Sequence, residues 1–245
     1  MVLSVSEVRQ IAGNDQHRMD NQIPAGMIKA TEKVVEQIKQ AAGEGASLIC
    51  FPQWFVGFGN VDTVPNDTIG KISEVAKENK IDVVTGTFRI PGVGMKSKPV
   101  SVMINRNGEV MGIQGKKNLY PLEEQWQLSS EEVELFDTDS GKIIISHGDD
   151  TIDPEVYDKI KGMKPDIWVL QTNNAINFKK YYPDAVSFLQ VIKLRASKLS
   201  CIICAPMLKG EFMHVNYSGG SFVVKPNGDV FSYNSGAGDL LIVEA

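Results

Sequence analysis

Two hairpin signatures, each preceded by alternating helices and strands, constrain the fold of this chain most. The turn sequence Asn-Arg-Asn-Gly at 105–108 separates apolar runs at 100–104 and 109–113. Lys-Pro-Asn-Gly at 225–228 does the same between 221–224 and 229–233. Asn-Gly favours the positive φ angles of a tight hairpin turn. The repeated arrangement predicts an internally duplicated α/β sandwich.

Helical spacing of apolar residues and short apolar runs locate the remaining elements. Helices are predicted at 25–42, 69–79, 154–161 and 184–199, and strands at 47–51, 81–86, 143–146, 166–171 and 200–205. No linker-like stretch or change of composition interrupts the pattern, so we expect one domain over residues 1–245.

Composition narrows the class of protein. The 245 residues carry a formal net charge of −5 without a basic stripe, which argues against nucleic acid as a partner. No apolar run approaches the roughly 20 residues that cross a bilayer, and Glu7 and Arg9 follow too soon for a signal sequence. We therefore expect a cytoplasmic protein with no membrane partner.

The cysteines and histidines predict no metal site and no cofactor. Cys50, Cys201 and Cys204 lie in apolar runs and are interpreted as core thiols. A redox or metal role for Cys201 and Cys204 is the weaker alternative, since strand residues three apart point to opposite faces. His17, His147 and His214 lack the spacing of metal ligands.

Five sequence blocks, in a fixed order, carry a family resemblance. They are Ala-Ser-Leu-Ile-Cys-Phe-Pro-Gln at 46–53, Lys-Lys-Asn-Leu-Tyr-Pro at 116–121, His-Gly-Asp-Asp-Thr-Ile-Asp-Pro-Glu at 147–155, Leu-Arg-Ala at 194–196 and the Gly-Gly-Ser hairpin at 219–230. Together they resemble the carbon-nitrogen hydrolase (nitrilase) superfamily. The resemblance implies a four-layer αββα sandwich that usually forms a homodimer.

The same resemblance implies a catalytic site in which two positions have changed. In the family, a glutamate base activates a cysteine nucleophile and a lysine stabilises the oxyanion. Lys116 matches the lysine and Glu124 an accessory glutamate, but Gln53 stands at the base position and Gly148 at the nucleophile position. A glutamine amide cannot accept the proton, and glycine has no nucleophile.

Neighbouring residues offer a rewired site as an alternative. Asp149 is a candidate base for water, with Lys116 as electrophile. Strand alternation predicts that Ser146 lies on the Gly148 side and His147 on the opposite side. Against this, Lys116 and Glu124 can form a structural ion pair, and Asp149 and Asp150 can be turn or cap residues before the helix at 154–161.

Polar and aromatic residues near these blocks are candidates for a substrate pocket. The predicted pocket residues are Trp54, Trp126, Ser146, Gln171, Thr172 and Asn173, although the tryptophans are most simply core or pocket-wall residues and 171–173 are equally a solvated loop. Three hypotheses follow: a non-catalytic binder of a small amide- or carboxylate-like ligand or subunit of an active partner, a rewired hydrolase, and an oligomeric scaffold with a filled pocket. A homo-oligomer is expected in each case.

Overall fold

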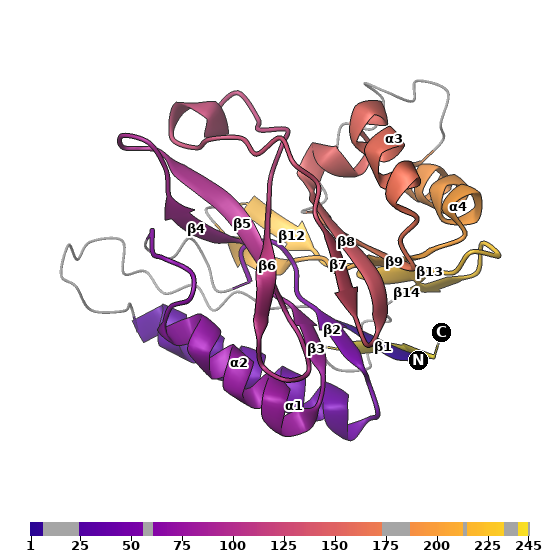
Figure 1. The fold of residues 1–245 in the computed structure, drawn as a ribbon, viewed down its shortest axis with the longest axis horizontal. Coiled ribbons are helices and arrows are strands. Elements are labelled where there is room, and N and C mark those ends of the chain that lie inside the picture. Colours follow the sequence, from indigo (N-terminus) through magenta and orange to yellow (C-terminus); the bar gives the residue numbers. More distant parts are fainter. Residues whose placement is uncertain (7–24, 56–60, 173–186, 213–214, 233–239, 245) are drawn as a thin grey trace.

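Two β-sheets pack face to face between two layers of helices (Figure 1). The computed structural model describes residues 1–6, 25–55, 61–172, 187–212, 215–232 and 240–244. Helices α1 and α2 cover the outer face of one sheet, and α3 and α4 cover the outer face of the other. The predicted four-layer αββα sandwich is confirmed.

The first sheet has the strand order β15-β1-β2-β3-β5-β4, with β6 paired to β5. Its elements are β1 (Val2–Ser6), α1 (Ala25–Gly43), β2 (Leu48–Cys50), α2 (Asp67–Asn79), β3 (Asp82–Val84), β4 (Phe88–Pro91), β5 (Ser97–Ile104), β6 (Val110–Gly115) and β15 (Leu240–Glu244). Gly108, in the turn between β5 and β6, has φ +78°, as the Asn-Gly signature predicts.

The second sheet has the strand order β14-β13-β10-β9-β8-β7. Its elements are β7 (Leu135–Thr138), β8 (Gly141–His147), α3 (Pro154–Met163), β9 (Ile167–Gln171), α4 (Phe188–Leu199), β10 (Ile202–Ala205), β13 (Phe222–Val224) and β14 (Val230–Ser232). Strands β11 (Lys209–Phe212) and β12 (Val215–Ser218) form a separate ribbon, and two 3₁₀ turns, η1 (Glu123–Gln125) and η2 (Gly148–Thr151), complete the described elements.

The two sheets repeat one topology. Strands β1, β2 and β3 are mutually parallel and continue into the antiparallel hairpin β5-β6. Strands β8, β9 and β10 are likewise parallel and continue into the antiparallel hairpin β13-β14. An antiparallel strand flanks each set, β15 beside β1 and β7 beside β8. The predicted internal duplication is confirmed.

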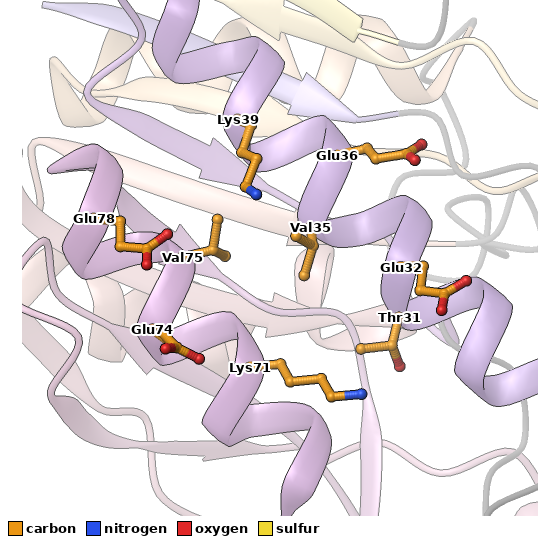
Figure 2. Close-up of a pocket in the computed structure, with 9 residues that line it drawn as sticks. All are labelled: Thr31, Glu32, Val35, Glu36, Lys39, Lys71, Glu74, Val75 and Glu78. Atoms are coloured by element: carbon orange, nitrogen blue, oxygen red, sulfur yellow. The ribbon is translucent and has the colours of Figure 1, made fainter.

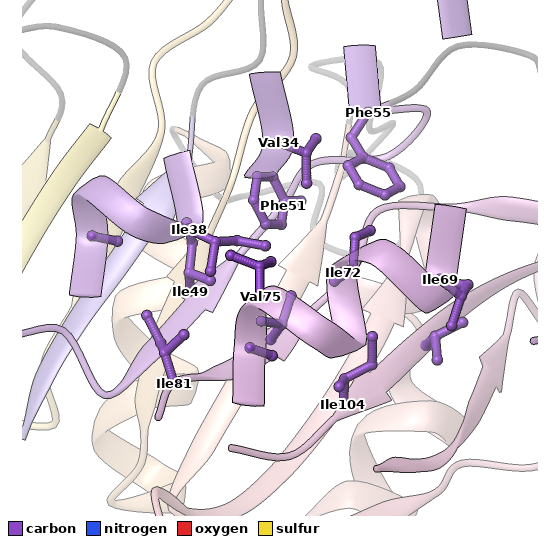
Figure 3. Close-up of a cluster of buried hydrophobic side chains, with 14 of the residues drawn as sticks. Val34, Ile38, Ile49, Phe51, Phe55, Ile69, Ile72, Val75, Ile81 and Ile104 are labelled. Atoms are coloured by element: carbon purple, nitrogen blue, oxygen red, sulfur yellow. The ribbon is translucent and has the colours of Figure 1, made fainter. Parts of the chain in front are cut away.

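Strand alternation distributes the buried side chains over three apolar layers. On β2, Ile49 packs under α1 and α2, whereas Leu48 and Cys50 face the second sheet (Figure 3). On β8, Ile144 packs under α3 and α4, and Ile145 faces the first sheet. Each strand is therefore apolar on both faces, as expected for a sheet covered on both sides.

The three cysteines are buried free thiols, as predicted. Cys50 and Cys204 lie in the layer between the sheets, and Cys201 lies in the layer beneath α3 and α4. Burial, followed by the neighbouring Cys204 thiol, raises the pKa of Cys50 well above its usual value. Among the described helices, none has both the length and the apolarity needed to span a bilayer.

A buried carboxylate joins the two sheets at the amino end of β3. The two Asp82 oxygens accept hydrogen bonds from the backbone N–H of Arg106 (2.7 Å), in the β5-β6 turn, and of Ser140 (3.2 Å), in the β7-β8 turn. Asp82 is fully buried, and the Arg106 guanidinium lies 3.7 Å from it. This residue ties both hairpin turns to the core.

We predict that Asp82→Ala lowers the free energy of unfolding by roughly 2–4 kcal/mol, because it leaves two backbone N–H groups without their acceptor. Urea denaturation measures the change. Asp137→Ala, at an exposed position of β7, is the matched control and should shift stability by less than about 0.5 kcal/mol. Equal losses of unfolding free energy in the two variants would contradict the role of Asp82 in holding the two hairpin turns.

Candidate functional site

The three residues at the expected catalytic positions each lie just after the end of a strand. Gln53 lies in the turn after β2, Lys116 follows β6, and Gly148 follows β8. In α/β sheets, ligand sites form where parallel strands reach their carboxyl ends. Both β2 and β8 are such strands, one from each sheet.

A buried network of hydrogen bonds connects these strand ends across the two sheets. The Gln171 side-chain amide, at the end of β9, donates to the carbonyls of Phe51 (2.8 Å) and Thr85 (2.6 Å). Its oxygen accepts a hydrogen bond from the Ser101 hydroxyl, and that hydroxyl lies 2.9 Å from His147 Nε2. Phe51 is two residues from Gln53, and His147 directly precedes Gly148.

The network determines the protonation of His147. Both amide hydrogens of Gln171 are used by carbonyls, so its oxygen faces Ser101, and the Ser101 hydroxyl must donate to it. Ser101 then accepts from His147, which assigns the proton to Nε2. Burial and then the nearby Lys116 charge lower the pKa of His147 to about 3, so the ring is neutral.

Lys116 is buried and paired with an acid. Its Nζ lies 2.7 Å from Glu123 Oε2, and the same oxygen accepts the backbone N–H of Tyr120 at 2.9 Å. The Lys116 side chain is 2% exposed and that of Glu123 15%. Nζ also lies 4.5 Å from the centroid of the Tyr120 ring. The ammonium is thus held at a fixed position by one carboxylate and one aromatic face.

The side-chain position of Gly148 lies beside this ammonium. A Cβ at Gly148 would lie 3.4 Å from both Lys116 Cε and Nζ and 3.7 Å from the Tyr120 hydroxyl. These are ordinary van der Waals distances, so the position has room for a side chain. The backbone has φ +50°, a conformation that side chains adopt only at a cost. The chain turns from β8 into η2 at Gly148, and we call this turn the elbow. The positive φ directs the side-chain position of Gly148 at Lys116.

Gln53 is buried with unused hydrogen-bonding capacity. Its side chain is 4% exposed, and within the described residues Nε2 has no hydrogen-bond partner. A buried amide nitrogen without an acceptor costs roughly 1–3 kcal/mol. This donor is therefore available to a bound acceptor.

Backbone contacts hold the lysine loop and the elbow together. The buried Asp150 carboxylate accepts the backbone N–H groups of Lys117 (2.9 Å) and Asn118 (2.6 Å). Arg195, from α4, donates to the carbonyls of Thr151 and, at 2.9 Å, Ile152. The 3₁₀ turn η2 is thereby tied to both the Lys116 loop and α4.

The sequence profile of the carbon-nitrogen hydrolase family matches residues 24–244, which is most of the chain. The chain belongs to the carbon-nitrogen hydrolase family. Among curated protein sequences, none matches it significantly.

Solved structures of the family share its fold. An amidase from Nesterenkonia sp. AN1, as a glutamate-to-glutamine mutant with the acetamide moiety of fluoroacetamide on its active-site cysteine, superposes with a TM-score of 0.77 at 18% identity, over 99% of this chain and 89% of that one. A glutamine-dependent NAD⁺ synthetase from Acinetobacter baumannii has a TM-score of 0.75 at 18% identity, over 98% of this chain and 44% of that one. At this identity, the likeness concerns the fold.

A double mutant of the Nesterenkonia amidase, with glutamate replaced by glutamine and cysteine by alanine, was solved in complex with acrylamide. It superposes with a TM-score of 0.75 at 18% identity, over 99% of this chain and 88% of that one.

The acid beside Lys116 is Glu123 and not Glu124, which corrects the sequence prediction. Glu124 is exposed, and its backbone carbonyl accepts a hydrogen bond from Lys96 Nζ at 2.7 Å. Successive residues of a 3₁₀ turn are about 120° apart, so only one of two adjacent glutamates can face Lys116. The spacing of eight residues between Lys116 and Glu124 did not show which of the two glutamates faces the lysine.

Ser146 is directed away from the elbow and is not a pocket residue in this structure. Its hydroxyl accepts a hydrogen bond from the indole N–H of Trp168 at 2.9 Å, and Trp168 packs in the layer under α3 and α4. His147, the next residue of β8, bonds to Ser101 of the opposite sheet. The predicted opposition of Ser146 and His147 is confirmed, but Ser146 lies on the helix side.

The other predicted pocket residues have different environments. Both hydrogens of the Gln171 amide are used within the protein, so its predicted role as a ligand donor is replaced by a structural one. Thr172 is buried, and within the described residues its hydroxyl has no hydrogen-bond partner. Trp54 is buried, whereas Trp126 is partly exposed with the Arg89 guanidinium 5.6 Å from its ring centroid. Asn173 lies outside the described residues.

Asp149 is partly exposed and contacts the site through Tyr120. The Tyr120 hydroxyl donates to Asp149 Oδ1 at 3.4 Å, and Asp149 also accepts backbone hydrogen bonds in the η2 turn through its carbonyl. Burial, with the negative charges of Asp149 and Glu123, raises the pKa of Tyr120, so the phenol keeps its proton. Sequence reasoning missed Tyr120, Ser101 and Glu123, since each acts through contacts across elements.

The raised pKa of Asp150 predicts that the stability of the fold depends on pH. Burial raises its pKa from 3.8 to about 6, against the opposing effect of its backbone hydrogen bonds. In the window from 3.8 to 6 the folded state binds the proton and the unfolded state does not, so this contribution to stability decreases as pH rises. As the pH rises through this window, we expect the free energy of unfolding of the wild type to fall relative to that of Asp150→Asn, by about 1.4 kcal/mol for each pH unit.

Denaturant titrations of both proteins at several pH values measure this difference. A difference that stays constant between pH 4 and 6, with both proteins folded, would show that Asp150 has an ordinary pKa. The Asp137→Asn variant, at an exposed position, should show no such trend.

Proposed function

We propose that this chain is a non-catalytic member of the carbon-nitrogen hydrolase family that binds a small amide or carboxylate ligand between Gln53, Lys116 and Gly148. The observation that carries this proposal is the position of Gly148, where a Cβ would lie in van der Waals contact with Lys116 Nζ at 3.4 Å. The ammonium and the elbow are retained while the nucleophile is absent.

The acyl-enzyme route requires groups that the site lacks. Gly148 cannot attack a carbonyl carbon, and the neutral Gln53 amide cannot remove a proton from a nucleophile. Loss of a nucleophile in an unrelated hydrolase lowers turnover by about 10⁶-fold. Ser146 does not replace it, since its hydroxyl is directed at Trp168.

The same groups favour binding of an oxygen acceptor. Lys116 supplies a buried cation, and Gln53 Nε2 supplies a buried donor without a partner among the described residues. A ligand carbonyl or carboxylate would satisfy both and would occupy the space left by the nucleophile. The Nesterenkonia amidase that lacks its glutamate and cysteine and holds acrylamide supports this interpretation.

A rewired hydrolase is the second candidate, and Asp149 is the observation that favours it. Its carboxylate bonds to the Tyr120 hydroxyl, which lies 3.7 Å from where a Gly148 side chain would begin. A water molecule in that space could lose a proton to Asp149 and attack a carbonyl polarised by Lys116. This route needs neither Gln53 nor a nucleophilic side chain.

We predict that small amides and carboxylates raise the melting temperature of the protein without release of ammonia. A panel of amides, nitriles, N-carbamoyl compounds and carboxylic acids is scored for both signals on the same samples. Lys116→Met, which keeps the apolar stem and removes the charge, should lose the ligand-induced stabilisation because the ligand oxygen then has no cation.

Three other outcomes have different meanings. Ammonia released by the wild type and lost in Asp149→Asn would establish the rewired hydrolase. Stabilisation that persists in Lys116→Met would place the ligand elsewhere. The absence of both ammonia release and stabilisation would favour the scaffold or partner-subunit hypothesis over ligand binding.

We predict that Gly148→Cys restores a reactive thiol at the elbow. The added Cβ meets no atom closer than 3.4 Å, and the φ of +50° should cost about 1–2 kcal/mol of stability. Incubation with fluoroacetamide should add one acetamide moiety, as in the glutamine-bearing mutant of the Nesterenkonia amidase. Intact-protein mass spectrometry measures the adduct.

The wild type is the control for this experiment, since its three thiols are buried and should not react. Combining Gly148→Cys with Gln53→Glu supplies the family's base as well and should add measurable amidase turnover. A folded Gly148→Cys protein that forms no adduct would contradict the placement of Gly148 beside Lys116.

A further inference from the structure

A second cation, Arg89, lies in the same row of the first sheet as Lys116. In the register of the strands, Arg89 of β4 pairs with Pro99 of β5. On the other side of β5, Val100 pairs with Gly115 of β6, and the backbone N–H of Lys116 donates to the Pro99 carbonyl at 3.2 Å. Arg89, Pro99 and Lys116 therefore lie side by side across β4, β5 and the end of β6.

The two cations of this row are directed to the same face of the sheet. Residues directly opposite each other on neighbouring strands share a face, and their Cα atoms are about 4.5–5.5 Å apart, so the Cα atoms of Arg89 and Lys116 are separated by roughly 10 Å. Phe88, the neighbour of Arg89, packs beneath α1 and α2. Alternation therefore directs Arg89 to the opposite face, where Lys116 meets the side-chain position of Gly148.

One turn of the chain positions both cations. The 3₁₀ turn η1 supplies Glu123, which pairs with Lys116 at 2.7 Å. Trp126 directly follows this turn, and the centroid of its ring lies 5.6 Å from the Arg89 guanidinium carbon. The backbone carbonyl of Trp126 accepts the N–H of Ser97 on β5 at 3.1 Å, which fixes the tryptophan to the same sheet.

A buried hydroxyl lies between Arg89 and the turn that carries Gln53. Thr87 is two residues before Arg89, so alternation directs both side chains to the same face. A Cβ at Gly86 would overlap the Pro52 carbonyl oxygen, so the segment before β4 packs directly against the turn of Gln53. Thr87 is 1% exposed, and among the described residues its hydroxyl has no hydrogen-bond partner. This hydroxyl is available to donate to an acceptor that Arg89 also contacts.

The environment of Arg89 favours an anion as its ligand. Burial lowers the pKa of Arg89 below its usual value, yet a guanidinium stays charged at neutral pH. A cation that has lost part of its hydration is stabilised by a carboxylate, and the planar guanidinium can donate two parallel hydrogen bonds to one. Trp126 stacks against the same guanidinium and limits the positions that it can adopt.

We propose that Arg89, with Thr87 and Trp126, forms a second anion-binding position, so that the ligand carries a terminal carboxylate in addition to the amide or carboxylate that Lys116 binds. Because it extends the same ligand toward β4, this position rests on the proposed function. Parallel side chains keep the spacing of roughly 10 Å, and two charge-assisted bonds of about 2.8 Å leave roughly 4–5 Å between the two ligand groups. Short dicarboxylates such as succinate and glutarate, and their monoamides, have this span.

A groove elsewhere in the molecule supplies the matched control. It lies between α1 and α2, has a volume of about 550 Å³ and contains Lys39 and Lys71 (Figure 2). Four glutamates also line it: Glu32, Glu36, Glu74 and Glu78. The groove is on the helix-covered side of the first sheet, opposite to the face of Arg89. Lys71→Met therefore removes a cation without touching the row of Arg89 and Lys116.

Calorimetric titration with glutarate and valerate tests the second anion-binding position. The two acids have the same chain length and differ in the second carboxylate, and neither has a C–N bond, so binding is measured without turnover. We expect the wild type to bind glutarate about tenfold more tightly than valerate, because the second carboxylate forms a charge-assisted pair. Arg89→Met keeps the apolar stem against Trp126 and should abolish this preference while the affinity for valerate stays unchanged.

Two further variants define the source of the preference. Lys71→Met should retain the wild-type preference for glutarate. Arg89→Lys keeps the charge without the planar fork and should retain part of the preference, which a purely structural role of Arg89 would not predict. A preference that persists in Arg89→Met or disappears in Lys71→Met would overturn the second position, and so would a loss of both affinities by the same factor in Arg89→Met.

The wild type alone separates failure of this position from failure of the proposed function. Equal affinities for glutarate and valerate would overturn the second position and leave ligand binding at Lys116 intact. The same titrations with glutaramate and valeramide repeat the comparison for amides. Binding of none of the four compounds would overturn the proposed function together with the second position.

Discussion

The Gln171 side chain is the connection on which the geometry of the candidate site depends. Two covered sheets enclose polar backbone groups at their strand ends, and each such group must find a partner without water. One amide satisfies carbonyls of two strand ends in the first sheet from its position in the second, and it orders Ser101 and His147. The strand ends next to Gln53 and Gly148 are thereby held at a fixed position relative to each other.

The contacts that hold the strand ends together do not depend on a cysteine at position 148 or a glutamate at position 53. The elbow at Gly148 keeps a positive φ, Asp150 holds the lysine loop, and Arg195 holds the η2 turn. None of these contacts requires a cysteine or a glutamate base. Scaffold and chemistry are physically separable here, since backbone hydrogen bonds and buried side chains maintain the first, and only two side chains supply the missing part of the second. This separation is what would allow the proposed binding function.

Local signals were sufficient for most of the regular elements. The Asn-Gly turns, the apolar runs and the helical spacings predicted all four helices and the parallel strands β2, β3, β8, β9 and β10, because each signal is contained within one element. The pattern did not reveal β1, β4, β7 or β15. These strands are only four or five residues long and partly polar, and β4, β7 and β15 lie at the ends of their sheets, so their pairing is decided by the neighbour and not by their own periodicity.

The sequence by itself determined the layered fold and the family, because periodicity and ordered blocks are one-dimensional properties. Only the tertiary structure decided which glutamate meets Lys116, that Ser146 faces Trp168, and that Gln171 joins the sheets. Each of these depends on the direction of a side chain across elements far apart in the chain. Such directions follow from packing in three dimensions, which spacing along the chain does not contain.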